Sequence, residues 1–254
     1  MKIQNDVLAV LSDCRVDGNI MYLPAIQLER KLYTEVNKCL TNIGGKWNRK
    51  EKGHVFDYEP IDALDNLILT GETENLKKTF QFFATPRDIA EMMCELAELT
   101  ADRRVLEPSC GEGDLADVIY EQGIASLMGI ELNREKERYL SAKPYKTLIG
   151  VDFLEFVEDS DAQHDWTHVI MNPPFSRQQD IDHIRAAFSV LKSGGILVSV
   201  VSVSPFFRTN KKSVDFRNWL DENNAEVIDI PAGAFKASGT NIPTKIIKIV
   251  KATI

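Results

Sequence analysis

Four consecutive residues, Asn172, Pro173, Pro174 and Phe175, combine groups suited to chemistry on a flat ring that carries an amino group. The side-chain oxygen of Asn172 and the backbone carbonyl of Pro173 can accept the two N–H groups of that amino group. Acceptors held in fixed positions stabilise the positive charge that develops on the nitrogen during attack. The prolines keep the backbone rigid and bring no competing N–H. Phe175 offers a face for ring stacking, although a diproline turn after a strand also occurs without any chemistry.

A second candidate site lies upstream, where a strand ending at Glu107 runs into a turn that contains Ser109, Gly111 and Gly113. Glycines let the backbone approach a ligand closely, and the helix expected after this turn offers free N–H groups at its N-terminus. The dinucleotide fingerprint G-x-G-x-x-G is incomplete, because Ala116 stands at its third glycine. We predict a cofactor-binding turn, with a dinucleotide site and a ligand-free turn as the alternatives.

Two later strand ends carry residues of the kind that bind nucleosides. Glu131 closes the next strand, and its carboxylate can accept both hydroxyl protons of a ribose. Asp152 closes the third strand and can receive an adenine amino group, while Phe153 packs against the purine face. An acidic residue in such a place is also a common helix N-cap. Three successive strand ends of this kind favour a cofactor that contains a nucleoside.

The elements that must position these residues alternate between strand-like and helix-like patterns. Helical patterns cover 89–99 and 181–191. The strand-like stretches are 103–107, 126–131, 147–152, 168–171, 195–203, 225–230 and 245–250. Such alternation predicts an α/β fold, a Rossmann-like seven-stranded sheet that is mostly parallel and covered by helices on both faces.

A smaller unit is expected before this sheet. We predict an α+β extension over residues 1–75 and the larger domain over residues 76–254. Within the extension, apolar residues recur every three or four positions on one helix face, and Gly44 with Gly45 ends that helix. These apolar residues are Leu28, Leu32, Val36, Leu40 and Ile43. A hairpin over 46–56 follows, with apolar flanks around a charged turn.

The net charge of −8 is unusual for a nucleic-acid binder, but the charges are unevenly distributed. Residues 30–52 contain seven Lys or Arg and two Asp or Glu, which makes a basic patch in an otherwise acidic chain. We predict that it contacts phosphates, although solvated lysines on a hairpin are commonplace. The candidate phosphate contacts are Lys46, Arg49, Lys50 and Lys52 on the hairpin, and Arg208, Lys211 and Lys212 after the fifth strand.

Composition indicates a globular cytoplasmic protein. No run reaches the roughly 18 apolar residues of a membrane span, and the first residues lack the pattern of a signal peptide. The four cysteines lie far apart without a CxxC pair, which argues against a zinc site and a disulfide framework, so we expect no metal. These cysteines are Cys14, Cys39, Cys94 and Cys110.

The sequence 172–175 resembles the Asn/Asp-Pro-Pro-aromatic motif of amino-methyltransferases. Residues 83–86, Phe-Ala-Thr-Pro, resemble the Phe-x-Thr-Pro element that precedes the cofactor turn in one circularly arranged group of these enzymes. The order of the three motifs is similar to the gamma class of DNA N6-adenine methyltransferases, including modification subunits of type I restriction systems. This resemblance covers roughly residues 80 to 250. It implies transfer of a methyl group from S-adenosylmethionine to N6 of a flipped adenine.

The resemblance also implies roles for individual residues. Asn172, Pro173, Pro174 and Phe175 would be catalytic, and Phe235 would be the second aromatic residue around the flipped base, although a core phenylalanine is an equally good interpretation. The cofactor-binding residues would be Phe83, Thr85, Pro86, Glu107, Ser109, Gly111, Gly113, Glu131, Asp152, Phe153 and Asn172.

The partners and the acceptor remain open at this stage. In the gamma class a target-recognition domain usually follows the catalytic domain, whereas this sequence ends after the last strand. DNA contact would therefore come from the N-terminal extension or from a separate specificity subunit. The alternatives are a protein N5-glutamine methyltransferase, whose motif normally ends in tyrosine, an RNA base methyltransferase, and a non-catalytic DNA-binding or anti-restriction module.

Overall fold

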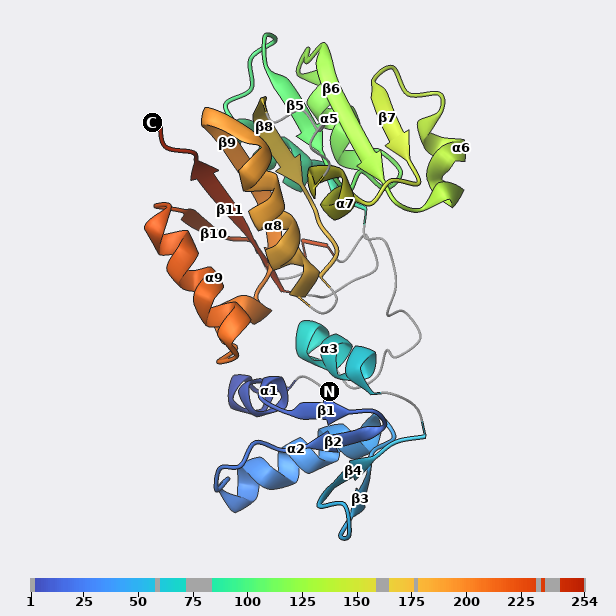
Figure 1. Ribbon diagram of the computed structural model, residues 1–254, viewed down its shortest axis with the longest axis vertical. Helices are drawn as coiled ribbons and strands as arrows, with labels where there is room; N and C mark the ends of the chain where they lie inside the picture. The colour runs from blue at the N-terminus through green and yellow to red at the C-terminus, as the bar shows by residue number, and fades with distance from the viewer. Residues whose placement is uncertain are drawn as a thin grey trace. The chain divides into compact units, whose positions relative to one another are not determined.

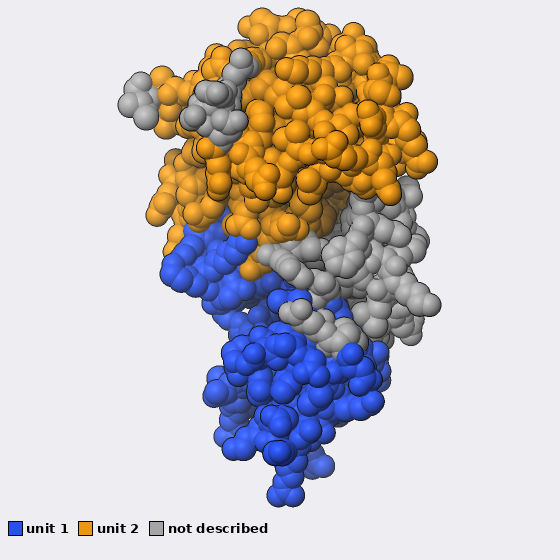
Figure 2. Space-filling view, turned by 45° about the vertical axis from the view of Figure 1, so that its right-hand side comes forward, with its two compact units in different colours: residues 1–81, 203–217 blue, residues 82–202, 218–254 orange. Residues whose placement is uncertain are grey.

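The computed structural model describes residues 3–57, 60–71, 84–158, 165–175, 178–231, 234–235 and 243–253. The chain divides into two compact units, coloured separately in Figure 2. The first contains Met1–Gln81 and Val203–Arg217, and the second contains Phe82–Ser202 and Asn218–Ile254. The domain boundary predicted after residue 75 lies outside the described residues.

The first unit is a small α+β structure. Its helices are α1 (Asn5–Ser12), α2 (Arg30–Asn42) and α3 (Ile61–Thr70). Its strands are β1 (Arg15–Asp17), β2 (Ile20–Tyr22), β3 (Lys46–Asn48) and β4 (Gly53–Val55), in the antiparallel order β1-β2-β4-β3. The predicted hairpin is confirmed, and so is the predicted helix, except that it begins at Arg30 and Leu28 lies before it. The predicted helix face packs inward, because Val36, Leu40 and Ile43 are buried and Leu28 and Leu32 lie against the same core.

Residues 203–217 belong to this unit although they follow the fifth strand of the larger sheet. Here the short helix η4 (Ser204–Phe206) leads to Phe207, which packs against the core of the first unit. Arg208 is only 6% exposed, and its Nη2 lies 3.3 Å from Oδ1 of Asp65 on α3. An ion pair this far from water ties the segment to the unit.

Replacing Asp65 with alanine is expected to destabilise the first unit by about 3–5 kcal/mol, because a buried guanidinium would lose its carboxylate. Urea unfolding followed by circular dichroism measures the change. The control is Asp17→Ala, which breaks an exposed pair with Arg15 and should shift stability by about 0–1 kcal/mol. Equal shifts in the two variants would show that burial of the Asp65 pair does not matter.

The second unit is built on a seven-stranded sheet with the order β10-β11-β9-β8-β5-β6-β7. Five neighbouring strands are parallel: β5 (Arg104–Glu107), β6 (Ser126–Glu131), β7 (Lys146–Ile149), β8 (Trp166–Met171) and β9 (Leu191–Ser202). The strands β10 (Glu226–Asp229) and β11 (Thr244–Val250) add an antiparallel edge. The helices described in this part are α4 (Arg87–Leu96), α5 (Asp114–Glu121), α6 (Glu137–Leu140), α7 (Phe153–Glu158) and α8 (Gln179–Val190), while α9 (Lys211–Glu222) begins in the first unit and ends in this one.

Helices cover both faces of this sheet. In Figure 1, α8 lies in front of the sheet and α5 behind it, which agrees with right-handed crossovers running in opposite directions from the middle of the sheet. All six residues of β8 are buried, as expected for a central strand covered on both faces. The predicted Rossmann-like α/β fold is confirmed.

The strand order reverses between β5 and β8, which are neighbours although β6 and β7 lie between them in sequence. In open α/β sheets, ligands bind at such a switch point, beyond the carboxyl ends of the strands. The fold therefore places the ends of β5 and β8, at Glu107 and Met171, beside the expected binding crevice.

Candidate active site

A small pocket lies at this switch point. It contains about 190 Å³ of empty space, part of it open to solvent. The residues that line it are Thr85, Glu107, Ser109, Cys110, Asp114, Leu115 and Asn172. Residues from all three sequence motifs therefore meet in one place, although they lie far apart in the chain.

The turn between β5 and α5 is built from unusual backbone geometry. Gly111 and Gly113 have φ of +56° and +96°, a region that other residues rarely adopt. A Cβ on Gly113 would also come within 2.6 Å of the Tyr145 hydroxyl. Any other residue at this position would therefore suffer both an unfavourable φ and a steric clash. The backbone N–H of Cys110 donates to the carbonyl of Ile130 at 2.9 Å, which fixes the turn against β6.

Glu131, at the end of β6, holds the same turn with its carboxylate. Its Oε2 accepts the Gly111 N–H at 2.8 Å, and its Oε1 accepts the Asn133 N–H at 2.7 Å. Each carboxylate oxygen has a second lone pair, so both can still accept a ligand hydroxyl. Glu131 therefore supports the turn and retains the capacity predicted for it.

Asp152 lies after β7 and directly before α7, and Phe153 is the first residue of α7. Oδ1 of Asp152 accepts the Leu154 N–H at 2.8 Å, the hydrogen bond typical of a helix N-cap. Phe153 is 2% exposed, and its ring centroid lies 5.6 Å from that of His183 on α8. The ring is therefore packed inside the protein, and its contact with a purine stays a prediction. Burial holds the pKa of His183 below its usual value, and the nearby Asp152 offsets only part of this shift.

Asn172 follows β8 and is oriented by the Thr-Pro element before α4. Its Nδ2 donates to Oγ1 of Thr85 at 3.2 Å, and its Oδ1 is buried. Thr85 is itself only 8% exposed. The amide is therefore held by its nitrogen, an arrangement compatible with Oδ1 acting as an acceptor for substrate.

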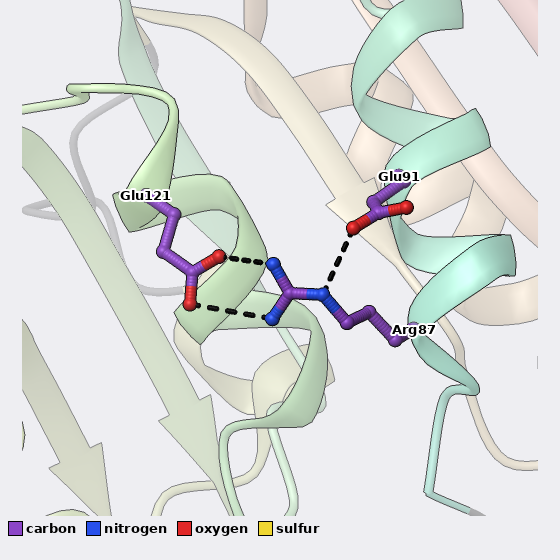
Figure 3. A network of polar contacts seen from close by, with 3 residues as sticks. All are labelled: Arg87, Glu91 and Glu121. Atoms are coloured by element: carbon purple, nitrogen blue, oxygen red, sulfur yellow. Dashed lines mark hydrogen bonds and ion pairs between the residues drawn. The ribbon is translucent and has the colours of Figure 1, made fainter.

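Arg87 anchors the start of α4 two residues after Thr85 (Figure 3). Its Nε donates to Glu91 at 2.9 Å, and its Nη2 lies 2.5 Å from Oε2 of Glu121 at the end of α5. The arginine is exposed, so this network contributes little to stability. It links the helix after Thr85 to the helix after the glycine turn.

The remaining residues of the 172–175 motif differ in exposure. Pro174 is exposed, Pro173 is buried, and Phe175 is only 7% exposed. Phe235 is likewise 2% exposed. Neither ring presents an open face for stacking, and such contacts would require movement when a base enters. Pro86 is half-buried beside Thr85, and Phe83 lies outside the described residues.

Acidic side chains surround the glycine turn. Glu107 is 2% exposed, and burial followed by repulsion from Asp114 holds its pKa well above the usual range. Burial also raises the pKa of Asp114. Two lysines face this region, and each has a carboxylate partner: Lys136 with Glu112 at 2.6 Å, and Lys143 with Asp117.

The candidate phosphate contacts fall into two groups. On the hairpin, Lys46, Arg49, Lys50 and Lys52 are all exposed, as is Trp47, which is 50% exposed. Of the other group, Arg208 is buried against Asp65, so the structure gives it an internal ion pair in place of the exposed position that the sequence suggested. Lys211 is exposed and paired with Asp215, and Lys212 is half-buried.

Four residues near the site were not predicted from the sequence. Cys110, Asp114 and Leu115 line the pocket, and Leu132, directly after Glu131, is 61% exposed. Leu132 could have been found from the sequence, because it is an apolar residue directly after the acidic residue that ends β6. Asp114 could have been found from its place at the first turn of the helix, next to Gly113.

Comparison with known proteins identifies the fold. No protein-family model matches the chain, and no curated protein matches its sequence. A modification subunit assigned to a type I restriction enzyme from Vibrio vulnificus YJ016 is similar over 88% of this chain and 53% of its own, at 16% identity and a TM-score of 0.55. The M protein of the type I restriction enzyme EcoKI is similar over 97% of this chain and 57% of its own, at 17% identity and a TM-score of 0.53.

A protein assigned as an RNA methyltransferase from Pyrococcus horikoshii matches 70% of this chain and 89% of its own, at 20% identity, but with a TM-score of only 0.48. The chain spans a little over half the length of the two modification subunits. At these identities the likeness establishes the shared fold. Among the described residues, no helix could cross a membrane and no cluster of His, Cys, Asp and Glu could hold a metal ion.

Proposed function

We propose that the chain is an S-adenosylmethionine-dependent methyltransferase of the gamma class that methylates N6 of adenine in DNA. The observation that carries this proposal is the shared pocket. It brings Asn172 of the diproline motif against Glu107 and Ser109 of the glycine turn at the switch point of the sheet. The structural likeness to two modification subunits of type I restriction enzymes supports the same class of activity.

The charge of the turn supports this cofactor over a dinucleotide. S-adenosylmethionine supplies a methyl group on a positively charged sulfur. Most of the charged residues around the turn are acidic, and the two lysines that face it are already paired with carboxylates. A pyrophosphate would be repelled by Asp114, which lines the pocket, whereas a cation is attracted. In this proposal Glu131 receives the ribose hydroxyls and Asp152 the adenine amino group.

Asn172 and Pro173 perform the chemical role. Their two oxygens accept the N–H groups of the adenine amino group and stabilise the charge that develops on its nitrogen. The bond from Asn172 to Thr85 keeps the amide in a single orientation. Phe175 and Phe235 flank the flipped base, which costs a few kcal/mol to extract from the duplex.

DNA is the proposed partner, and the exposed hairpin of the first unit supplies backbone contacts. Its basic side chains lie around a turn that also exposes Trp47. A separate specificity subunit is a further proposed partner, supported by the likeness to modification subunits of type I enzymes.

Replacing Lys46, Arg49 and Lys50 together with alanine is expected to flatten the salt dependence of DNA binding. Each lost phosphate contact reduces the slope of log K against log salt by about 0.9, so the triple variant should lose up to about 3 units of slope. Fluorescence anisotropy with a labelled duplex at several salt concentrations measures this.

The matched control for the hairpin changes three exposed cations of the second unit, Arg138, Lys146 and Lys192, to alanine. It alters the net charge equally but should leave the slope nearly unchanged. A slope that falls equally in both variants would point to overall charge, and the hairpin would then have no special role.

The acceptor is tested by incubation with S-adenosylmethionine carrying a labelled methyl group and a panel of DNA, RNA and protein acceptors, followed by mass analysis. The proposal expects N6-methyladenine in DNA. Label confined to RNA, or to glutamine side chains, would replace the DNA assignment with one of those activities.

A further inference from the structure

Glu107 is a buried acidic residue of the candidate cofactor site. It lines the pocket, and only 2% of it is exposed. The backbone N–H of Ala116 donates a hydrogen bond to the Glu107 carboxyl group, whereas Oε2 of Glu107 has no hydrogen-bond partner. An ionised carboxylate in such surroundings loses hydration without gaining a compensating cation.

The groups that face Glu107 from neighbouring elements increase this cost. The groups that interact with it electrostatically are Asp114 and Asp117 on α5, Glu131 on β6, Cys110 in the turn, Cys94 on α4, and Tyr145 before β7. Three of them are carboxylates. Lys143, which faces the glycine turn, is bound to Asp117, and the Tyr145 hydroxyl donates to the same carboxylate at 2.8 Å.

These surroundings favour the neutral form of Glu107 in the free protein, which is the direction of its raised pKa. Introducing a positive charge into the pocket reverses the preference, because the carboxylate would then gain the partner that it lacks. Glu107 lines the pocket, and its buried Oε2 has no hydrogen-bond partner that would offset the charge of an ionised carboxylate.

We propose that binding of a cationic cofactor drives the proton off Glu107 into solvent, and that the resulting carboxylate balances the cofactor's positive charge. The inference rests on the proposed function, because it requires S-adenosylmethionine as the ligand. Atoms and charge balance: the carboxyl O–H bond breaks, the proton passes to the buffer, and the positively charged ligand takes its place.

Proton release makes affinity depend on pH in a defined direction. Between the pKa of Glu107 in the complex and its raised pKa in the free protein, the association constant should increase by up to tenfold for each pH unit. Below the lower value and above the higher value it should level off. A pocket without this exchange would bind the cofactor with the same affinity across that range.

The experiment is calorimetry of S-adenosylmethionine binding to the full chain in two buffers of different ionisation enthalpy, at several values from about pH 5 to about pH 8. The difference in heat between buffers gives the number of protons released. We expect up to one proton per bound cofactor in the wild-type protein and none in Glu107→Gln, whose affinity should also be independent of pH.

The matched control is Glu112→Gln, which removes an acid of the same turn that is paired with Lys136. It should retain the proton release. Wild-type binding without proton release, or release that persists in Glu107→Gln, would overturn the inference while leaving the proposed function intact. Absence of cofactor binding at every pH would instead overturn the proposed function.

Thermal unfolding of the ligand-free variant provides a second test. Because the pKa of Glu107 is raised in the folded protein, its ionisation lowers stability as pH increases from the ordinary carboxyl range towards the folded value. Glu107→Gln removes that loss. Its Tm should therefore exceed the wild-type Tm by a margin that grows with pH, and a constant or negative margin would contradict the proposed protonation.

Discussion

Replacing Asn172 with alanine is expected to reduce turnover by a factor on the order of 10² to 10³, the usual effect of removing one group that stabilises charge in a transition state. Affinity for S-adenosylmethionine should change little, because the glycine turn and Glu131 remain in place. Steady-state kinetics with a DNA substrate measure turnover, and calorimetry measures cofactor affinity.

Two further variants separate the role of the Asn172 oxygen from a general disturbance. Asn172→Asp keeps an acceptor oxygen and can still pair with the Thr85 hydroxyl, so it should retain more activity than the alanine variant. Thr85→Val removes the partner of the amide nitrogen and should lower turnover by a smaller factor than Asn172→Ala. Full turnover in Asn172→Ala would remove the catalytic assignment.

Replacing Glu131 with alanine is expected to weaken S-adenosylmethionine binding by about 10- to 100-fold. Hydrogen bonds to a charged group contribute about 1.5–3 kcal/mol, and the carboxylate is expected to accept the ribose hydroxyls. The variant also releases the N–H groups of Gly111 and Asn133, so part of the loss comes from a looser turn. Calorimetry measures the affinity directly.

The control for Glu131 is Glu137→Ala, which removes an exposed carboxylate from the nearby helix α6. The affinity of Glu137→Ala for S-adenosylmethionine should match that of the wild-type protein. Glu131→Gln preserves the size of the side chain and should fall between the wild-type protein and the alanine variant. Wild-type affinity in Glu131→Ala would mean that the cofactor lies elsewhere or that Glu131 only supports the turn.

Local patterns were sufficient to predict most elements of the sheet. The strand at 126–131 has the predicted bounds, because its apolar residues are continuous and a polar loop follows. The strand predicted at 147–152 instead ends at Ile149, since Gly150 with φ of +75° turns the chain. The strand predicted to begin at 195 begins at Leu191, where pairing with Trp166 extends it past an irregularity in the register.

Long-range contacts explain what local patterns missed. Arg208 looked like an exposed cation, but its partner Asp65 lies 143 residues away and removes it from the surface. Similarly, Phe175 was expected to offer a stacking face, whereas tertiary packing leaves it 7% exposed. Alternation of strands and helices predicted the sheet, yet the meeting of Thr85, Glu107 and Asn172 in one pocket depends on the strand order, which sequence spacing does not contain.

The central claim is that the glycine turn and Asn172 form one site, with the methyl donor between them. A crystal structure of the protein with bound S-adenosylmethionine or S-adenosylhomocysteine tests it most directly. We expect the ligand in the pocket lined by Thr85, Glu107 and Asn172, with its sulfur facing the Asn172 side chain. A ligand bound away from this pocket, or an Asn172 side chain turned away from the sulfur, would contradict the account.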